Sequence, residues 1–135
     1  MFDTKIAIVV RDDLAVWQKL NVTAFLTSGI VGAADGLIGE PYEDADGNRY
    51  NALCVQPMIV LATDAAGMRK IFDRAMTRAV PLSLYTEEMF STGHDAANRA
   101  AVKAVAAADL TIVGLALRED KKVVDKITKG AKMHP

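Results

Sequence analysis

Residues 5–32, KIAIVVRDDLAVWQKLNVTAFLTSGIVG, decide the fold that we predict for this chain. The run IAIVV at positions 6–10 has no polar alternation, which is typical of a strand covered on both faces of a sheet. A helix is predicted to follow, because five residues recur at the three- and four-residue steps of one helical face: Trp17, Leu20, Ala24, Ser28 and Val31. A buried strand leading into a long helix that turns this face to the core indicates an α/β protein.

The length and composition of the chain indicate one ordered domain, residues 1–135. The sequence is 51% hydrophobic and 24% charged, and its formal net charge of -1 gives no overall attraction to nucleic acid. The charge is uneven, because residues 118–135 contain six Lys or Arg against three acids. This basic segment predicts a solvated helix face or, as the alternative, an RNA-binding surface that Lys122, Lys126 and Lys129 would carry.

The single cysteine, Cys54, cannot form a disulfide within the chain, so nothing indicates an oxidising compartment. The apolar run near the start is too short for a secretion signal, and no stretch of eighteen apolar residues occurs in the sequence. We therefore expect a cytoplasmic protein with no membrane partner.

Strand and helix signals alternate along the rest of the sequence. Strands are predicted at 56–63, 82–85 and 110–117, and helices from Asp64 to just before Pro81, at 96–108 and at 120–129. The turn Asp46-Gly47-Asn48 predicts a hairpin within residues 40–50. The alternation predicts a three-layer α/β/α sandwich, and the hairpin together with the Ala-rich helix at 96–108 favours a mixed central sheet.

The usual signatures of nucleophilic or metal catalysis are weak in this sequence. Ser91, His94 and Asp95 have the residue types of a catalytic triad, but neighbours on one loop rarely adopt its geometry. Cys54 is interpreted as a buried, inert cysteine rather than as a nucleophile served by His94. One Cys and two His have no ligand spacing, so we expect no metal and no cofactor.

Two polar segments remain as candidates for a site. Lys19, Thr23 and Thr27 follow one another at steps of four on the predicted first helix, and a polar loop at 86–95 follows a predicted strand. If both reach the same end of the sheet, a lysine, hydroxyls and carboxylates converge in a crevice, where sites in such sandwiches commonly lie. An ordinary solvated helix face is the alternative.

Both ends of the chain resemble a known fold. The opening KIAIVVRDDLAVWQKLNVTAFLTSGI and the ending DLTIVGLALREDKKVVDKITKGAKMHP are similar to the type-2 peptidyl-tRNA hydrolase fold. That family begins with a strand of the form KxVLVVR followed by a GKGKxAAQCxHA helix, and closes with TVLAIGPxxxxxVDxVTGxLKL. Over its whole length the chain resembles, more narrowly, an uncharacterised bacterial family, a domain of unknown function thought to share this fold.

The resemblance implies site residues in both polar segments. Lys19 falls at the lysine of the hydrolase helix, and Thr23 falls where that helix has glutamine. The segment TEEMFST at 86–92 stands where the family has Asp-Ala-Gly-x-x-Thr, and it contributes Glu87, Glu88 and Thr92. Ester cleavage needs a base for the attacking water and a cation for the developing oxyanion. Lys19 would supply the cation, and either glutamate would supply the base.

Two functions follow from the resemblance and from the predicted crevice. The first is hydrolysis of an acyl or ester bond such as that of peptidyl-tRNA, with tRNA or a small acylated molecule as the partner. The alternative is a noncatalytic binding or interaction module that kept the fold and lost the site. A homodimer is expected in either case.

Overall fold

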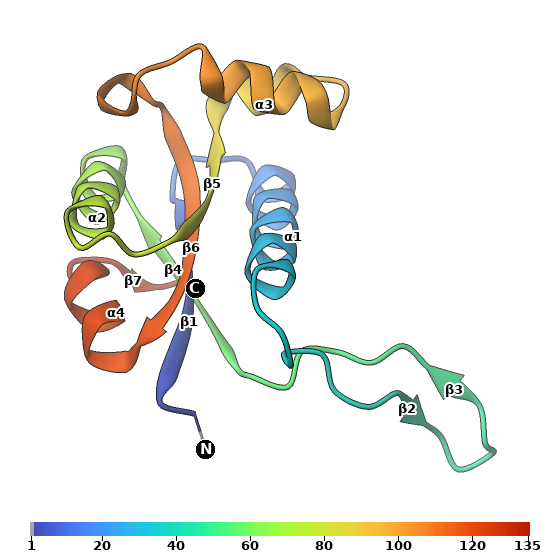
Figure 1. Cartoon of the computed structure of the whole chain (residues 1–135). Helices are drawn as coiled ribbons and strands as arrows, with labels where there is room; N and C mark the ends of the chain where they lie inside the picture. Colours follow the sequence, from blue (N-terminus) through green and yellow to red (C-terminus); the bar gives the residue numbers. More distant parts are fainter. Residues whose placement is uncertain (1) are drawn as a thin grey trace.

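A five-stranded sheet forms the centre of the protein in the computed structural model, which describes residues 2–135. Its strands are β1 (Thr4–Arg11), β4 (Met58–Thr63), β5 (Leu82–Thr86), β6 (Ile112–Asp120) and β7 (Lys132–Met133). They are arranged in the order β5-β6-β1-β4-β7, with β1 parallel to β4 and the other neighbours antiparallel (Figure 1). The predicted α/β class and the mixed central sheet are therefore confirmed.

Helices cover both faces of this sheet. α2 (Ala65–Thr77) and α4 (Lys121–Ile127) lie against one face, and α1 (Val16–Gly32) lies against the other (Figure 1). Successive side chains of β1 alternate between these two layers: Ala7 and Val9 pack toward α2 and α4, and Ile6, Ile8 and Val10 pack toward α1. The run at 6–10 is at most 1% exposed, as its apolar sequence predicted. No helix within residues 2–135 has the length and apolar character to cross a membrane.

The face of α1 that packs on the sheet is not the predicted one. Its buried residues are Val22, Leu26 and Ile30. The predicted core residues are exposed or half-buried instead: Trp17 (61%), Leu20 (67%), Ala24, Ser28 and Val31. The prediction was wrong because apolar residues occur all around this helix, so the three- and four-residue spacing fits more than one face.

Several other elements differ from the sequence predictions. The polar loop after β5 contains a 3-10 turn, η1 (Glu87–Ser91), and the helix predicted at 96–108 is shorter, α3 (Asp95–Lys103), with a second turn, η2 (Ala107–Asp109), after it. No residue of α3 is buried, so no core contact lengthens this helix and tight packing of its alanines was a wrong prediction. β7 carries no strand signal of its own and pairs with β4 after Gly130 turns the chain at φ 101°.

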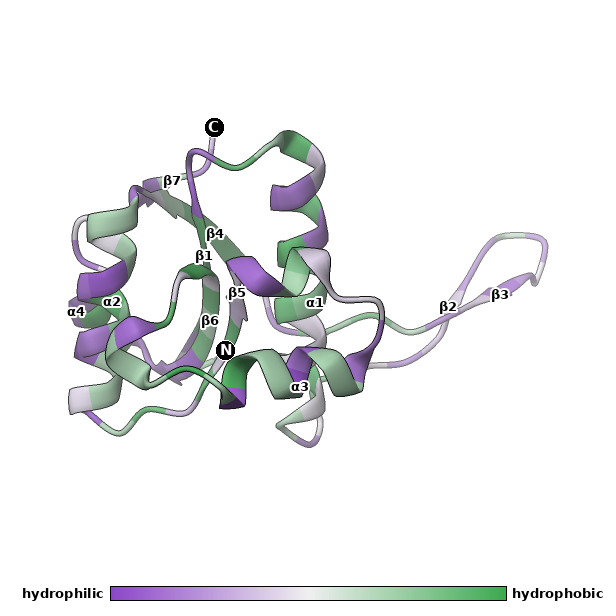
Figure 2. Cartoon of the chain, turned by 90° about the horizontal axis from the view of Figure 1, so that it is seen from above, coloured by the Kyte–Doolittle hydropathy of each residue, from purple (hydrophilic) through white to green (hydrophobic). Residues whose placement is uncertain are grey.

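Residues 37–55 form an arm that extends away from the sheet and its helices (Figures 1 and 2). Its tip is the predicted hairpin, made of β2 (Tyr42–Glu43) and β3 (Arg49–Tyr50), and a bridge between Ile38 and Cys54 joins its base. β2 and β3 contact mainly each other, so the tip of the arm has a hydrogen-bonded ladder of its own. At the base of the arm, Leu37 and Cys54 pack against the core between α1 and the sheet.

Asp44 closes the turn at the tip of the arm, and its protonation is expected to open that turn. Its carboxylate accepts hydrogen bonds from the Tyr50 hydroxyl (2.7 Å) and from the side chain and backbone of Asn48, which lower the pKa of Asp44 from 3.8 to about 2. Because the pKa of Asp44 is lower in the folded chain than in the unfolded chain, the stabilisation of the turn by its carboxylate is complete above the unfolded pKa. This stabilisation is lost as the pH falls from about 4 through about 2.

We expect the ring signals of Tyr50 in NMR spectra to move toward their unstructured values over this range. The Asp44→Asn variant should remove the pH dependence, since an amide does not titrate. A carboxyl of Asp44 that titrates at or above the ordinary aspartate value would contradict the prediction.

Candidate functional site

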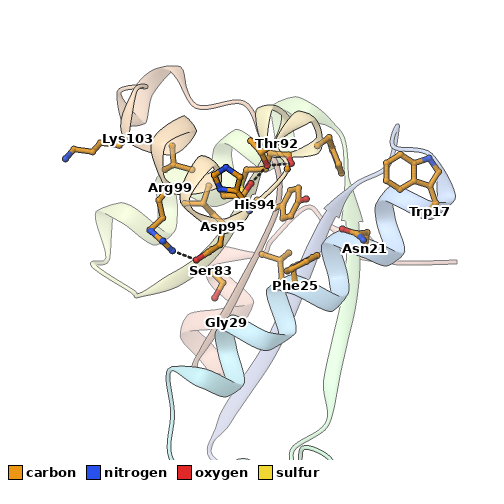
Figure 3. A pocket seen from close by; sticks show the side chains of 18 residues that line it. Trp17, Asn21, Phe25, Gly29, Ser83, Thr92, His94, Asp95, Arg99 and Lys103 are labelled. Carbon is orange, nitrogen blue, oxygen red and sulfur yellow. Dashed lines mark hydrogen bonds and ion pairs between the residues drawn. The ribbon is translucent and has the colours of Figure 1, made fainter.

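A cleft of about 810 Å³ lies between α1 and α3 (Figure 3). One wall is a stripe of α1 at four-residue steps, formed by Trp17, Asn21, Phe25 and Gly29. Residues 83–85 of β5 line the cleft as well, and η1 and α3 supply the other wall. Since β5 is an edge strand, its outer backbone groups have no strand partner, and a ligand in the cleft can reach them.

Aromatic side chains form the apolar part of the cleft. Trp17 meets Phe90 edge to face with 5.9 Å between ring centroids, Phe90 lies 5.2 Å from Tyr85, and Tyr85 lies 6.2 Å from Phe25. These distances are typical of favourable aromatic pairs. Four of the eight aromatic residues of the chain (four Phe, three Tyr, one Trp) therefore gather around one cavity.

Gly29 sets how closely α1 approaches the edge strand. A Cβ atom at this position would lie 2.4 Å from Oγ of Ser83, a distance that real Cβ atoms do not show. A side chain here would require the Ser83 side chain to shift or α1 to move away from β5. The small residue, which appeared in the sequence only as one glycine among several, therefore allows α1 to lie close to Ser83 of β5 at this wall of the cleft.

Polar groups line the α3 side of the cleft (Figure 3). The Thr92 hydroxyl hydrogen-bonds to the main-chain oxygen of Met89 at 2.9 Å and pairs with the side chain of Asn98. His94 begins α3, where its Nδ1 accepts the N–H of Ala97 at 3.2 Å. In the neutral ring the other nitrogen then carries the proton, so His94 offers a donor rather than a base at the cleft.

The loop does not form a catalytic triad. The Ser91 hydroxyl donates to the main-chain oxygen of Glu88 at 2.9 Å, and Asp95 forms an ion pair with Arg99 one turn along α3. Since Nδ1 of His94 caps the helix, none of these three side chains forms the hydrogen bond to another that a triad requires. The sequence interpretation, which did not favour a triad, agrees with this geometry.

Tyr85 contributes a phenol hydroxyl to the cleft wall. Tyr85 is 7% exposed, and desolvation raises the pKa of its phenol above the usual 10. An ordinary tyrosine hydroxyl is already protonated at neutral pH, and this shift moves its ionisation further from that range. It offers a hydrogen bond next to the aromatic surface.

A second polar group lies at the carboxyl ends of β1 and β5. Arg11, with its side chain 14% exposed, donates from Nε to Asp13 at 2.7 Å, and its Nη1 is 3.9 Å from Oε2 of Glu87. The hydrogen bond to Asp13 raises the pKa of Arg11, and the hydrogen bond from Arg11 lowers the pKa of Asp13. Arg11 thus connects Asp13, just before α1, with Glu87 of the predicted polar loop at this edge of the sheet.

The structure separates the sequence-predicted site residues into two places. Thr92 lines the cleft, whereas Lys19, Thr23, Glu87 and Glu88 do not. Among residues 2–135, no ion pair within 4.0 Å joins Lys19 to either glutamate. The positive charge of Lys19 instead helps to lower the pKa of Asp13. The Thr23 hydroxyl donates to the main-chain oxygen of Lys19 at 2.8 Å, inside the helix.

The three lysines near the end of the chain that would carry an RNA-binding surface are exposed. Lys122 and Lys126 lie on α4, and Lys129 follows its end. Lys129 also lines a cavity of about 440 Å³ together with Lys70, Lys132 and the start of α2. No three His, Cys, Asp or Glu side chains within the described residues are placed to hold a metal ion.

Sequence reasoning missed most of the cleft. Trp17 was assigned to the core, and Phe25, Tyr85, Phe90 and Arg11 were assigned no role. One signal was available, because a helix with apolar residues on every side exposes some of them unless it is fully buried. That surplus on α1 points to a binding surface, although it does not say which elements face it.

Two comparisons place the chain among known proteins. Residues 4–135 match the family described as Protein of unknown function (DUF2000). A solved structure of a protein of unknown function from Agrobacterium tumefaciens strain C58 is 60% identical, with a TM-score of 0.98 over 100% of each chain. No curated protein matches the sequence.

Proposed function

Because the chain belongs to the DUF2000 family of unknown function, its activity has to be inferred from its own site, and we propose that it is a small-molecule binding module. The ligand that we propose is an acyl or aryl carboxylate, an apolar body with an anionic end. The observation that carries the proposal is the aromatic cleft of about 810 Å³ between α1 and α3. Its volume lies within the range of about 300–1,000 Å³ that ligand sites usually have.

The two walls of the cleft support this ligand chemistry. Trp17, Phe25 and Phe90 offer aromatic surface to an apolar group. On the α3 side, Lys103 lies at the cleft and has no carboxylate within 4.0 Å among residues 2–135, whereas Arg99 is already paired. An anionic end of the ligand next to Lys103 gains a charge-assisted contact, and the apolar body gains burial.

Trp17 is the only tryptophan of the chain, so its fluorescence reports on the cleft. Titration with 1-anilinonaphthalene-8-sulfonate should change Trp17 emission saturably, and medium-chain fatty acids should displace the probe. Phe25→Ala removes one aromatic wall and is expected to raise the Kd about tenfold, which corresponds to about 1.4 kcal/mol. Met76→Ala, an equally exposed side chain on α2 away from the cleft, is the matched control and should leave the Kd unchanged.

The anionic end has a separate test. Lys103→Gln should weaken binding of a fatty acid and leave binding of the corresponding alcohol unchanged. Equal losses for both ligands would remove the anionic end from the proposal. Absence of saturable binding to the wild-type protein would remove the binding function.

Hydrolysis of an acyl or ester bond, such as that of peptidyl-tRNA, is the second function that we propose for test. The support for it is the edge of the sheet where β1 and β5 end, because Arg11 and Glu87 meet there. The Thr86 hydroxyl next to them is buried, with no hydrogen-bond partner among the described residues. Lys19 and Glu88 belong to the same proposal, as cation and alternative base, and Thr92, which lines the cleft, as a hydroxyl.

Cleavage of N-blocked aminoacyl-tRNA tests this second function. If Lys19 stabilises the developing oxyanion, Lys19→Ala should reduce the rate by about a hundredfold or more. Arg49→Ala, at the exposed tip of the arm on β3, is the control and should retain the wild-type rate. Equal background rates for the wild type and for Lys19→Ala would exclude the hydrolase.

The basic residues near the end of the chain are proposed to contact tRNA if the hydrolase proposal holds. Lys122, Lys126 and Lys129 are exposed, and phosphate contacts of this kind make binding strongly dependent on salt. Replacing Lys122 and Lys126 by glutamine should weaken tRNA binding and flatten its salt dependence. Binding that is absent or insensitive to salt would remove the RNA contact.

A further inference from the structure

Exposed apolar side chains are concentrated in two segments of this protein. Eleven large apolar side chains are exposed within residues 2–135, and nine of them lie either on α1 or in the arm. α1 exposes Val16, Trp17, Leu20 and Phe25, and the arm exposes Ile38, Tyr42, Tyr50, Leu53 and Val55. Surface this apolar and this localised marks a contact with another molecule rather than with solvent.

The arm in particular needs a partner to pack against. An isolated two-stranded hairpin is marginally stable in water, and β2 and β3 contact little besides each other. The arm nevertheless has the same course in the Agrobacterium relative, whose structure superposes on the whole chain, arm included. The extended arm is therefore part of the fold that the two proteins share.

We propose that the arm packs on α1 of a second copy of this chain, and that the two copies exchange arms in a twofold symmetric dimer. A reciprocal exchange uses both apolar segments at once and leaves neither exposed. The dimensions agree, because about ten residues of extended chain from the base to the tip span roughly 33 Å and the 17 residues of α1 span about 25 Å. The proposal does not depend on a ligand in the cleft.

Charge complementarity also favours a second copy. Residues 37–55 contain four acids, Glu40, Glu43, Asp44 and Asp46, against the single base Arg49. α1 has no acid, and Lys19 is its only charged residue. An acidic arm is therefore attracted to the helix that the same chain offers, and not to another arm.

The exposed apolar area of the two segments matches what a stable dimer needs. Aromatic side chains each bury about 150–250 Å², and the four on these two segments are more than half exposed. With the five aliphatic side chains the two segments offer on the order of 800 Å² per copy, the area that each partner contributes to a standard interface. Trp17 and Phe25 belong to both the helix face and the cleft, so the arm of the second copy also lies next to the ligand site.

Sedimentation velocity tests the dimer with three substitutions of the same kind. The wild type should sediment with twice the mass of the chain. Leu20→Glu on α1 and Leu53→Glu on the arm should each weaken association on the order of 100-fold, because symmetry removes the contact twice. Met76→Glu, on α2, is the control and should dimerise like the wild type. All three side chains are exposed, so circular dichroism should show an unchanged fold.

A mixture of the two defective variants identifies the contact itself. The arm of Leu20→Glu is intact, and so is the helix face of Leu53→Glu, so a mixed dimer retains one complete contact. The mixture should therefore associate more strongly than either variant alone. A monomeric wild type would overturn the proposal, whether the arm then packs against a different protein or against its own chain. A dimer that neither variant weakens, or a mixture that shows no recovery, would also overturn it.

Discussion

Replacing Leu26 by alanine is expected to lower the free energy of unfolding by about 2–5 kcal/mol, one of the two largest effects that we predict. Leu26 is 1% exposed and packs between α1 and the sheet with Val22, Ile30 and Val113. Truncation removes its buried methyl groups and leaves a cavity, because α1 is also held by Val22 and Ile30 and cannot close the gap. Chemical denaturation measures the loss.

Leu20 provides the comparison on the same helix. Its side chain is 67% exposed, so Leu20→Ala removes no contact within the chain and should change the stability of the monomer by no more than about 0.5 kcal/mol. Any larger effect of Leu20→Ala should depend on protein concentration, because it arises from the contact with a second copy. The loss caused by Leu26→Ala should have the same size at every concentration. Equal, concentration-independent losses for both variants would show that α1 packs on the sheet through a different face.

The strands were predictable because burial on both faces leaves a direct mark on the sequence. The runs at 6–10 and 112–117 consist of apolar residues and one glycine, and no other environment in a small domain favours such a run. The hairpin was predictable for a local reason, since Gly47 at φ 85° supplies the turn that its sequence indicates. Strand order was not predictable, because it depends on contacts between segments distant in the chain.

The cleft could not be predicted for the same reason. It forms where α1 meets β5, η1 and α3, and the lining residues of α1 are more than fifty residues in sequence from those of the other three segments. Each segment has an ordinary composition by itself. Thr92 was the one predicted site residue that lines it, whereas Glu87 lies outside it and pairs with Arg11 where β1 and β5 end. A surplus of apolar residues on α1 indicated that a surface existed, and only the tertiary arrangement showed where it lies.

Replacing Gly114 by alanine is the second substitution with a large expected effect. Gly114 lies on β6 directly under α1, and a Cβ there would be 2.5 Å from Cγ1 of Val22, 3.0 Å from Cδ1 of Leu26 and 3.3 Å from the main-chain oxygen of Val9. Overpacking of this kind costs about 1–3 kcal/mol. It should also weaken ligand binding, since lifting α1 moves Trp17 and Phe25 away from the opposite wall of the cleft.

Gly32→Ala separates this steric effect from a general effect of replacing glycine. Nothing lies within 4 Å of a Cβ at Gly32, at the end of α1, so alanine should leave stability unchanged or raise it by up to about 1 kcal/mol. The origin of the clash is tested by a double-mutant cycle with Val22→Ala, which removes the nearest methyl group. If Val22 is the obstacle, the double variant should lose less stability than the sum of the two single variants. Strict additivity would place the strain of Gly114→Ala elsewhere, and the close approach of α1 to β6 would then not be what requires glycine at this position.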